Sequence, residues 1–151
     1  MKSAFFPGSF DPFTKGHESL VKKAIELFDE VVIGIGVNSQ KSSYFELEKR
    51  TTHIKSLFVN DPNVRVISFN GLTVDYCKHN NIGFILRGLR DVKDFEYEKS
   101  IASMNLELSG IDTVFFMTEV LFSGINSTIV REIHKNGGVI EKFVTNSNLL
   151  V

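Results

Sequence analysis

The sequence has 151 residues, of which 42% are apolar and 23% are charged, which is the balance of an ordinary globular domain. Its formal net charge of −1 argues against a general nucleic-acid-binding protein, because such proteins carry a basic excess. The single cysteine, Cys77, excludes an internal disulfide framework and fits a reducing compartment. No stretch approaches the roughly 20 apolar residues of a membrane span, and the N-terminus lacks a signal-peptide pattern. We therefore expect one cytoplasmic domain over residues 1–151, bound neither to nucleic acid nor to a membrane.

Short apolar runs alternate along the chain with segments whose apolar residues recur every three or four positions, a pattern that predicts alternating strands and helices. The predicted strands are 4–6, 31–37, 64–69, 82–86 and 114–117. The predicted helices are 20–28, with its start near residue 17, then 47–58, 72–78, 95–108 and 127–134. This alternation predicts an α/β fold, a single doubly wound, Rossmann-like domain with a five-stranded parallel sheet. Ligands of such folds bind at the carboxyl ends of the strands, so the residues after each strand are the candidate site.

The loop after the first predicted strand, residues 7–17, has the features of an anion-binding turn. Gly8 and Gly16 allow a ligand to approach the backbone closely, and the following helix start presents unpaired N–H groups. His17 could donate a hydrogen bond to a phosphoryl oxygen, and a bound phosphate would favour its protonated form. The alternative is a proline-rich turn with a surface histidine.

Basic residues follow two further predicted strands. Lys41 lies in the polar loop 38–43 and could reach a phosphate, although a lone loop lysine is usually only solvated. Arg87 and Arg90 flank Gly88 directly after the fourth predicted strand, and arginine forks pair bidentately with phosphate oxygens. The alternative is an ion-paired turn, since several acidic residues, including Glu98, follow closely. Glu98 could equally accept a hydrogen bond from a nucleoside.

A run of small polar residues follows the fifth predicted strand. Asn126, Ser127 and Thr128 are all good helix-capping residues, but three in a row exceed what one cap requires. We expect them to form a second helix-start anion site that faces the first. Arg131 on the same helix reads as a solvated side chain.

Taken together, these segments resemble a known family. The sequences GSFDP (8–12), TKGH (14–17), RGLR (87–90) and NST (126–128) are similar to the signatures of the HxGH-type nucleotidyltransferases. The acidic and aromatic stretch 91–98 resembles the phosphopantetheine adenylyltransferase family in particular. The match runs in order over nearly the whole chain.

The resemblance implies an enzyme that joins ATP to 4′-phosphopantetheine and releases 3′-dephospho-coenzyme A and pyrophosphate. It further implies direct in-line attack without a covalent intermediate, Mg²⁺ that arrives with ATP rather than in a protein metal site, and a homohexamer. The implied catalytic residues are His17, Ser9, Lys41 and Arg90. The implied ATP contacts are Ser9, Phe10, His17, Gly88, Leu89, Arg90, Glu98, Phe122, Ser123, Gly124, Ile125, Asn126, Ser127 and Thr128. The implied acceptor contacts are Ser9, Lys41, Thr73 and Arg87.

Three positions depart from the family pattern. Ser9 stands where threonine is common, Asn126 where serine is usual, and Thr73 where a larger apolar residue is often found. The first two keep a hydrogen-bonding group, and a backbone contact at Thr73 would tolerate the change. Two other functions stay open: a related enzyme that adenylates nicotinate mononucleotide or cytidylates an alcohol phosphate, and a non-catalytic nucleotide-binding module.

Overall fold

Strands and helices alternate along the whole chain in the structure, a computed structural model that describes every residue from Met1 to Val151. The strands are β1 Ser3–Gly8, β2 Glu30–Gly36, β3 Val64–Phe69, β4 Phe84–Leu89 and β5 Asp112–Met117. The α-helices are α1 Lys15–Ala24, α2 Leu47–Leu57, α3 Thr73–His79, α4 Val92–Ser109 and α5 Ser127–Lys135. Two short 3₁₀ turns, η1 Val120–Phe122 and η2 Ser147–Leu149, complete the order.

The five strands form one parallel sheet in the order β3-β2-β1-β4-β5, which confirms the predicted fold class. The chain builds outward from β1 to β3 on one side and then crosses to β4 and β5 on the other. The strand order therefore reverses between β1 and β4, where Ala4 pairs with Phe84 and Phe5 with Ile85. A crevice at the carboxyl ends of these two strands is the expected ligand site.

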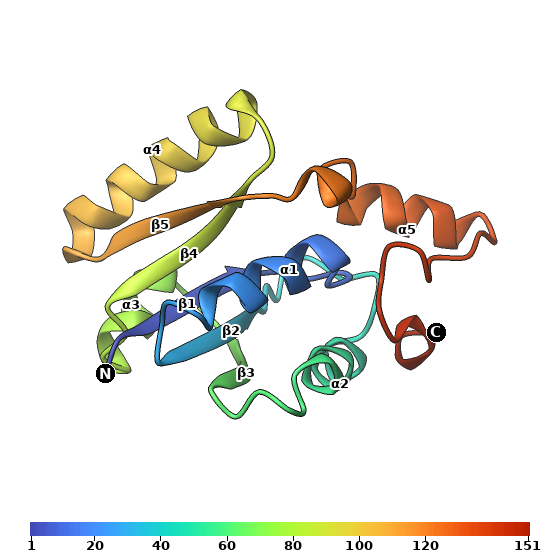
Figure 1. The fold of residues 1–151 in the computed structure, drawn as a ribbon, viewed down its shortest axis with the longest axis horizontal. Coiled ribbons are helices and arrows are strands. Elements are labelled where there is room, and N and C mark those ends of the chain that lie inside the picture. The colour runs from blue at the N-terminus through green and yellow to red at the C-terminus, as the bar shows by residue number, and fades with distance from the viewer.

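Two hydrophobic cores cover the two faces of the sheet. On one face, α1 and α2 pack on β1 and β2 through residues such as Phe6, Val21 and Ile54. On the other face, Phe5 and its neighbours pack against the short helix α3. A third, smaller cluster joins α5 to the C-terminal segment, which returns beside α2 (Figure 1).

The ends of α1 differ from the prediction, and capping and packing explain the difference. The helix begins at Lys15 because Thr14 adopts extended backbone and is bonded to the side chain of His17. It ends at Ala24, so the apolar residues up to Phe28 belong to a turn. Phe28 is still buried because the turn places its ring beside that of Phe84. An apolar residue is therefore required at this position, and it continues the helical spacing of apolar residues beyond the end of the helix.

The fourth strand is also longer than the apolar run predicts. Arg87, Gly88 and Leu89 are the last residues of β4 rather than a loop after it. They continue the ladder with β5, where Arg87 pairs with Phe115. The prediction ended the strand at its first charged residue, although a strand end that lines a site can carry a charged side chain.

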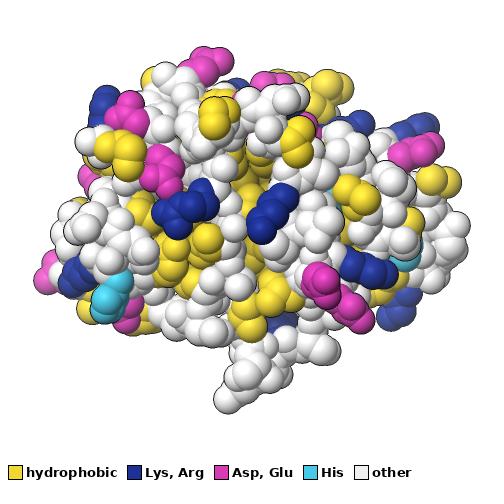
Figure 2. Space-filling view, turned by 90° about the horizontal axis from the view of Figure 1, so that it is seen from below, with side chains coloured by type: hydrophobic (Ala, Val, Ile, Leu, Met, Phe, Trp, Pro, Cys, Tyr) yellow, Lys and Arg dark blue, Asp and Glu magenta, His cyan; other side chains and the backbone are white.

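None of the helices combines the length and the apolar character that crossing a membrane requires. On the face shown in Figure 2, basic and acidic side chains are interspersed, and hydrophobic side chains gather in a central hollow. This face therefore has no basic stripe of the kind that tracks a nucleic-acid backbone.

Candidate active site

A cavity of about 310 Å³ opens at the carboxyl ends of β1 and β4, where the strand order reverses. The loop after β1, the start of α1, the end of β4 and the start of α5 all contribute to its wall. Eleven of the predicted site residues line it: Ser9, Phe10, His17, Arg87, Gly88, Arg90, Glu98, Phe122, Ile125, Asn126 and Ser127. Three chain segments that are distant in sequence, 6–20, 87–98 and 118–127, therefore meet around one space, whereas the fourth predicted segment, the loop 38–43, does not line it.

A second cavity of about 280 Å³ lies next to the first. The two share Pro7, Gly8, Arg87 and Glu98, so this group separates the two spaces. The second cavity continues over β3 and the middle of α4 and includes Thr73 at the start of α3. The predicted acceptor contact Thr73 thus lies on the far side of Arg87 from His17.

His17 is held in one orientation and one protonation state. Its Nδ1 accepts a hydrogen bond from the backbone N–H of Thr14 at 2.9 Å, and the Thr14 hydroxyl lies 3.2 Å away. A backbone N–H can only donate, so the proton of the neutral ring is on Nε2. Burial, followed by the positive charges of Arg87 and Arg90, lowers the pKa of His17 from 6.5 to about 4. Without a bound anion the site therefore holds a neutral imidazole whose Nε2–H is a donor.

The rings of three phenylalanines, Phe6 of β1 and Phe10 and Phe13 of the first loop, surround the imidazole. The ring centroids of Phe10 and Phe13 both lie 5.2 Å from that of His17, and Phe6 lies at 6.0 Å. Gly8 makes room for this cluster, because a Cβ on Gly8 would lie 2.7 Å from the Phe10 ring. The apolar surroundings explain why burial is the largest cause of the lowered pKa.

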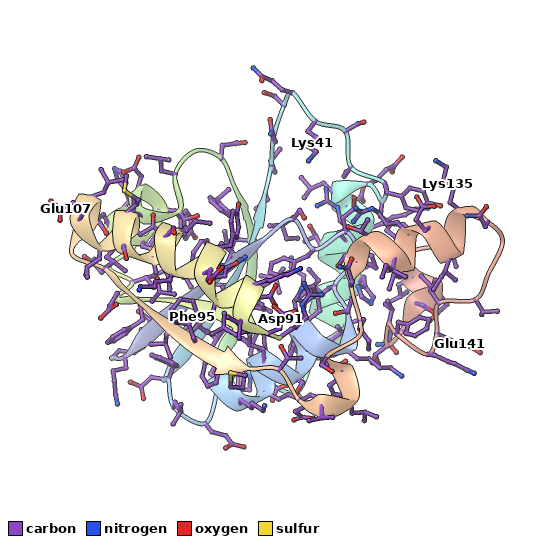
Figure 3. The ribbon with its side chains drawn as sticks, turned by 90° about the horizontal axis from the view of Figure 1, so that it is seen from above. Lys41, Asp91, Phe95, Glu107, Lys135 and Glu141 are labelled. Carbon is purple, nitrogen blue, oxygen red and sulfur yellow. The ribbon has the colours of Figure 1, made fainter.

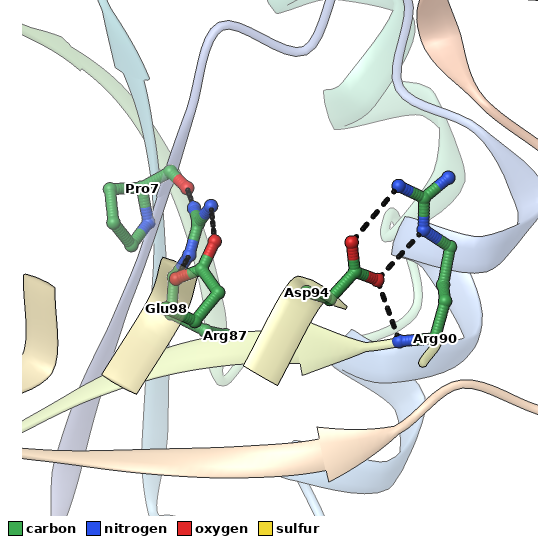
Figure 4. Close-up of polar contacts among 5 residues, drawn as sticks. All are labelled: Pro7, Arg87, Arg90, Asp94 and Glu98. Carbon is green, nitrogen blue, oxygen red and sulfur yellow. Dashed lines mark hydrogen bonds and ion pairs between the residues drawn. The ribbon is translucent and has the colours of Figure 1, made fainter. Parts of the chain in front are cut away.

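Arg87 forms a two-pronged ion pair with Glu98 from α4 (Figure 4). Its Nε and Nη2 lie 2.9 and 2.6 Å from the two carboxylate oxygens, and its Nη1 donates to the Pro7 carbonyl at 2.8 Å. A guanidinium has five N–H donors, so two remain for a ligand. The ion-pair alternative is therefore confirmed at Arg87, and the ligand contact stays a prediction for which two donors are available.

Arg90 makes a similar ion pair with Asp94, which lies one turn before Glu98 on α4. Its Nε lies 3.0 Å from Oδ2 of Asp94, and its backbone N–H donates to the same oxygen at 2.9 Å. These hydrogen bonds hold the pKa of the Asp94 carboxyl below its usual value. The partner Asp94 is more exposed than Glu98, 24% against 9%, so the Arg90–Asp94 pair is the weaker one and a bound anion could draw the Arg90 guanidinium toward the cavity at little cost.

The start of α5 forms the opposite wall of the cavity. Asn126 caps the helix, with its side-chain oxygen accepting from the N–H groups of Thr128 at 2.8 Å and Ile129 at 3.3 Å. The Ser127 hydroxyl donates to the Pro12 carbonyl at 2.9 Å. The run of small polar residues is thus divided: Asn126 is the cap, and Ser127 ties the helix to the first loop.

Six predicted residues lie outside the lining of the first cavity. Lys41 is exposed on the loop after β2, which extends from the body of the molecule (Figure 3), and it lines neither cavity. Thr73 lies in the second cavity. The remaining four are a buried strand residue and three residues near the start of α5: Leu89, Ser123, Gly124 and Thr128. Their assigned contacts stay predictions.

Two arginines that the sequence reading did not select hold the first loop in place. Arg50 of α2 is buried and donates to the carbonyl of Ser9 at 2.6 Å. Arg131, expected to be solvated, donates to the carbonyl of Asp11 at 2.8 Å. One signal was available for Arg50: it lies on the apolar stripe of α2 with Leu47 and Ile54, where a charged side chain needs buried partners.

The one thiol and the two carboxylates of the cavity are each occupied or shielded. Burial raises the pKa of the Cys77 thiol to about 12, which makes it a poor nucleophile. The chain holds no group of three or more histidine, cysteine or acidic side chains arranged to bind a metal. The two carboxylates of the cavity, Asp94 and Glu98, are both paired with arginines.

Solved structures with the same fold include other nucleotidyltransferases. A bifunctional NMN adenylyltransferase/ADP ribose pyrophosphatase from Francisella tularensis superposes with a TM-score of 0.73 at 20% identity, over 98% of this chain and 48% of that one. A nicotinic acid mononucleotide adenylyltransferase from Plasmodium falciparum, complexed with NaAD, gives a TM-score of 0.68 at 16% identity, over 99% of this chain and 93% of that one. At these identities the likeness establishes the fold alone.

Sequence relatives are closer. The cytidylyltransferase-like family model matches residues 5–133. A phosphopantetheine adenylyltransferase from Flavobacterium psychrophilum is 52% identical over 138 residues, 91% of each chain. One from Lachnoclostridium phytofermentans is 46% identical over 152 aligned positions, 100% of this chain and 93% of that one. The family predicted from the four motifs and the stretch 91–98 is therefore confirmed: this chain belongs to the phosphopantetheine adenylyltransferases, within the cytidylyltransferase-like nucleotidyltransferases.

Proposed function

We propose that this protein transfers the adenylyl group of ATP to 4′-phosphopantetheine, giving 3′-dephospho-coenzyme A and pyrophosphate. The observation that carries the proposal is the position of Arg87 between two adjoining cavities, with the neutral donor His17 in one of them. Two cavities separated by a guanidinium suit a reaction that joins two phosphate-bearing substrates. The family membership supports ATP and 4′-phosphopantetheine as those substrates.

In the proposed reaction, an oxygen of the acceptor phosphate attacks the α-phosphorus of ATP. The new P–O bond forms as the bond from the α-phosphorus to pyrophosphate breaks on the opposite side, so no atom of the protein is bonded to an intermediate. The protein then contributes positioning and charge stabilisation only. The Nε2–H of His17 and the hydroxyl of Ser9 would donate to the α-phosphoryl oxygens, where charge builds in the transition state.

The two substrates would occupy the two cavities. ATP would lie in the first, with its phosphates near Arg90 and between the starts of α1 and α5, whose unpaired N–H groups favour anions. The acceptor phosphate would take the two remaining N–H donors of Arg87, and its arm would extend past the backbone of Thr73. Lys41 would have to approach from its exposed loop to join the acceptor phosphate. The other assigned ATP contacts, Leu89, Glu98 and the loop 122–128, belong to the same proposal.

Mg²⁺ is best treated as part of the ATP substrate. No cluster of ligand side chains offers a resident site, and the nearby carboxylates are occupied by arginines. Phosphate oxygens and water commonly hold Mg²⁺ in such cases, and the ion then neutralises charge on the triphosphate.

We also propose that residues 1–151 act as one nucleotidyltransferase domain in the cytoplasm and assemble into a homohexamer. The single cysteine fits a reducing compartment. Helix α4, which lies along the β4–β5 side of the sheet (Figure 1), has a largely exposed apolar surface that includes Tyr97, Met104 and Leu108. An exposed apolar stripe on one helix supports a contact with another copy.

Pyrophosphate release tests the proposed reaction. Purified protein with ATP and Mg²⁺ should release pyrophosphate only when 4′-phosphopantetheine is added, with a matching amount of dephospho-coenzyme A. Nicotinate mononucleotide, and CTP with an alcohol phosphate, serve as control substrates. Release with a control substrate but not with phosphopantetheine would transfer the function to that related reaction. Tight ATP binding without turnover of any acceptor would make the protein a binding module.

A further inference from the structure

The backbone at Phe10, in the first loop, has a conformation that its residue type disfavours. Its φ is +47°, in the left-handed region that non-glycine residues seldom adopt. The Phe10 ring is buried among Phe6, Phe13 and His17, so the side chain cannot be exchanged for glycine without loss of the cluster. Other contacts must therefore hold this backbone in place.

Arginines from two different helices bind the carbonyls on either side of Phe10. Arg50 of α2 donates from Nη1 to the Ser9 carbonyl at 2.6 Å. Arg131 of α5 donates from Nη1 to the Asp11 carbonyl at 2.8 Å. We call Arg50 and Arg131 the loop brace.

Each arginine is itself fixed by further contacts. The Nε of Arg50 donates to the Phe45 carbonyl at 2.9 Å and its Nη2 to the Ser43 hydroxyl at 3.0 Å. The Nη2 of Arg131 lies 3.2 Å from the Thr128 hydroxyl at the start of α5. The brace therefore connects the first loop to α2, to the base of the loop that carries Lys41, and to the anion-binding start of α5.

The Asp11 side chain strengthens the same connection. Its two carboxylate oxygens accept the backbone N–H groups of Tyr44 at 2.7 Å and Phe45 at 2.8 Å. Asp11 is buried and lies beside Arg50, so the charge of each is compensated. Three chain segments are thus fixed around the Ser9–Asp11 turn.

The geometry of the peptide group gives the brace a consequence in the cavity. The Ser9–Phe10 peptide is trans, so its N–H points away from the carbonyl that Arg50 binds. No hydrogen bond is formed by the Phe10 N–H, although Ser9 and Phe10 both line the first cavity. Arg50 thus holds the Ser9 carbonyl on the side away from the cavity, and the Phe10 N–H remains available as a donor to a ligand.

We propose that Arg50 and Arg131 are positioning residues for ATP, which hold the Ser9–Asp11 turn so that the Phe10 N–H meets a phosphoryl oxygen. This inference rests on the proposed function, since it takes ATP as the occupant of the first cavity. Neither arginine lines that cavity, so their effect is transmitted through the backbone.

Substitution of Arg131 gives the cleaner test, because Arg131 is only partly buried whereas Arg50 is buried. The Arg131→Gln variant should bind MgATP about tenfold to a hundredfold more weakly in calorimetric titration, the usual effect of losing a hydrogen bond to a charged group. The KM for ATP should rise in parallel while the KM for phosphopantetheine stays the same. Arg131→Lys and Arg50→Lys, which each keep a positively charged nitrogen donor, should lose less ATP affinity than the corresponding glutamine variants.

Arg65→Gln is the matched control, because Arg65 pairs with Glu30 at 2.9 Å at the opposite end of the sheet. The control should keep the ATP affinity and both KM values of the original protein. A melting temperature of Arg131→Gln within about 4 °C of the original would separate positioning from unfolding. Unchanged ATP affinity, or a lower kcat with an unchanged KM for ATP, would overturn the brace. If the original protein binds ATP but leaves phosphopantetheine unreacted, the proposed function fails while the titration still tests the brace.

Discussion

At the scale of single residues, the protonation state of His17 decides what it can contribute. The Nδ1 of the neutral ring already accepts a hydrogen bond from the Thr14 N–H, so toward a substrate the ring can only donate, from Nε2. It can therefore stabilise charge on a phosphoryl oxygen but cannot first remove a proton from a substrate through Nδ1. This role fits a reaction in which the attacking phosphate is already an anion.

Replacement of His17 by alanine should lower kcat by about 10²–10³, the usual effect of removing one transition-state donor. The KM values for ATP and phosphopantetheine should change far less, because the donor acts mainly on charge that develops during the reaction. Steady-state kinetics with both substrates varied provides the measurement. His79→Ala, at an exposed histidine of α3, is the matched control. An unchanged kcat in His17→Ala would remove this residue from its role.

Arg87 combines a structural contact with a proposed binding contact, and two measurements separate them. Arg87→Gln should raise the KM for phosphopantetheine before that for ATP, because its two remaining donors are assigned to the acceptor phosphate. It should also lower the free energy of unfolding by about 1–3 kcal/mol, since it leaves the buried carboxylate of Glu98 without its partner. Urea unfolding measures the second effect.

The double variant Arg87→Gln/Glu98→Gln distinguishes the two contributions. It should recover much of the lost stability, because no unpaired charge remains in the wall. The KM for phosphopantetheine should stay high, because the donors are still missing. A larger effect on ATP than on phosphopantetheine would exchange the assignments of Arg87 and Arg90.

At the scale of helices and strands, the start of α5 tests one departure from the family pattern. Asn126→Ala removes both side-chain hydrogen bonds of the cap and should cost about 1 kcal/mol in urea unfolding. Asn126→Ser restores the residue that is usual in the family and should cost only a few tenths of a kcal/mol, because serine caps almost as well. An equal loss in both variants would mean that the asparagine has a contact that serine cannot replace.

Many of the helices and strands could be predicted from the sequence because their positions depend on local patterns of apolar residues. The third strand, Val64–Phe69, has the bounds that its apolar run predicts, and the residues after β1 and β5 do line the cavity. The extension of β4 to Leu89 could not be predicted, because it depends on pairing with β5. Long-range pairings of this kind leave no mark in the neighbouring sequence.

The candidate site shows the same division. His17, Arg87 and Arg90 were found because they follow strand-like runs next to glycines. Arg50 was missed because its partners are a serine hydroxyl and two backbone carbonyls, one of them 41 residues away, which no side-chain motif reveals. The sequence predicts Lys41 as a site residue, but in the structure Lys41 does not reach the cavity. The backbone of its loop makes only local contacts, such as the hydrogen bond from Lys41 to Asn38, and these do not hold the loop against the site.

At the scale of the whole molecule, the exposed surface of α4 leads to a test of assembly. Met104 and Leu108 are four residues apart on this helix and are 63% and 59% exposed, so both lie on one apolar face. Met104→Glu/Leu108→Glu should shift the sedimenting species toward the mass of a single chain. Val59→Glu, at a residue 76% exposed in the turn after α2, provides the control for added charge. A single-chain mass for the original protein would contradict the proposed hexamer.

Two histidines, the buried His53 and the partly buried His17, connect the stability of the whole molecule to pH. His53 is completely buried and its Nε2 lies 2.7 Å from the Thr145 carbonyl, while Nδ1 has no partner. Burial lowers the pKa of His53, and burial together with two arginines lowers that of His17 to about 4. Above pH 6.5, both residues are largely neutral in the folded and unfolded states. Below pH 6.5, the unfolded chain takes up protons that the folded chain does not, so the free energy of unfolding must fall.

Urea unfolding at pH 7 and pH 5 should measure this loss. The part due to His17 should be about 2 kcal/mol at pH 5, because each unit of pH below 6.5 costs about 1.4 kcal/mol until the folded pKa is reached. His17→Gln and His53→Gln, which cannot titrate, should each lose less stability than the original protein over this interval. Equal losses in all three proteins would mean that neither histidine is held neutral. Bound MgATP should reduce the difference at His17 alone, because the negative charge of the triphosphate raises the pKa of a nearby imidazole while leaving the distant His53 unchanged.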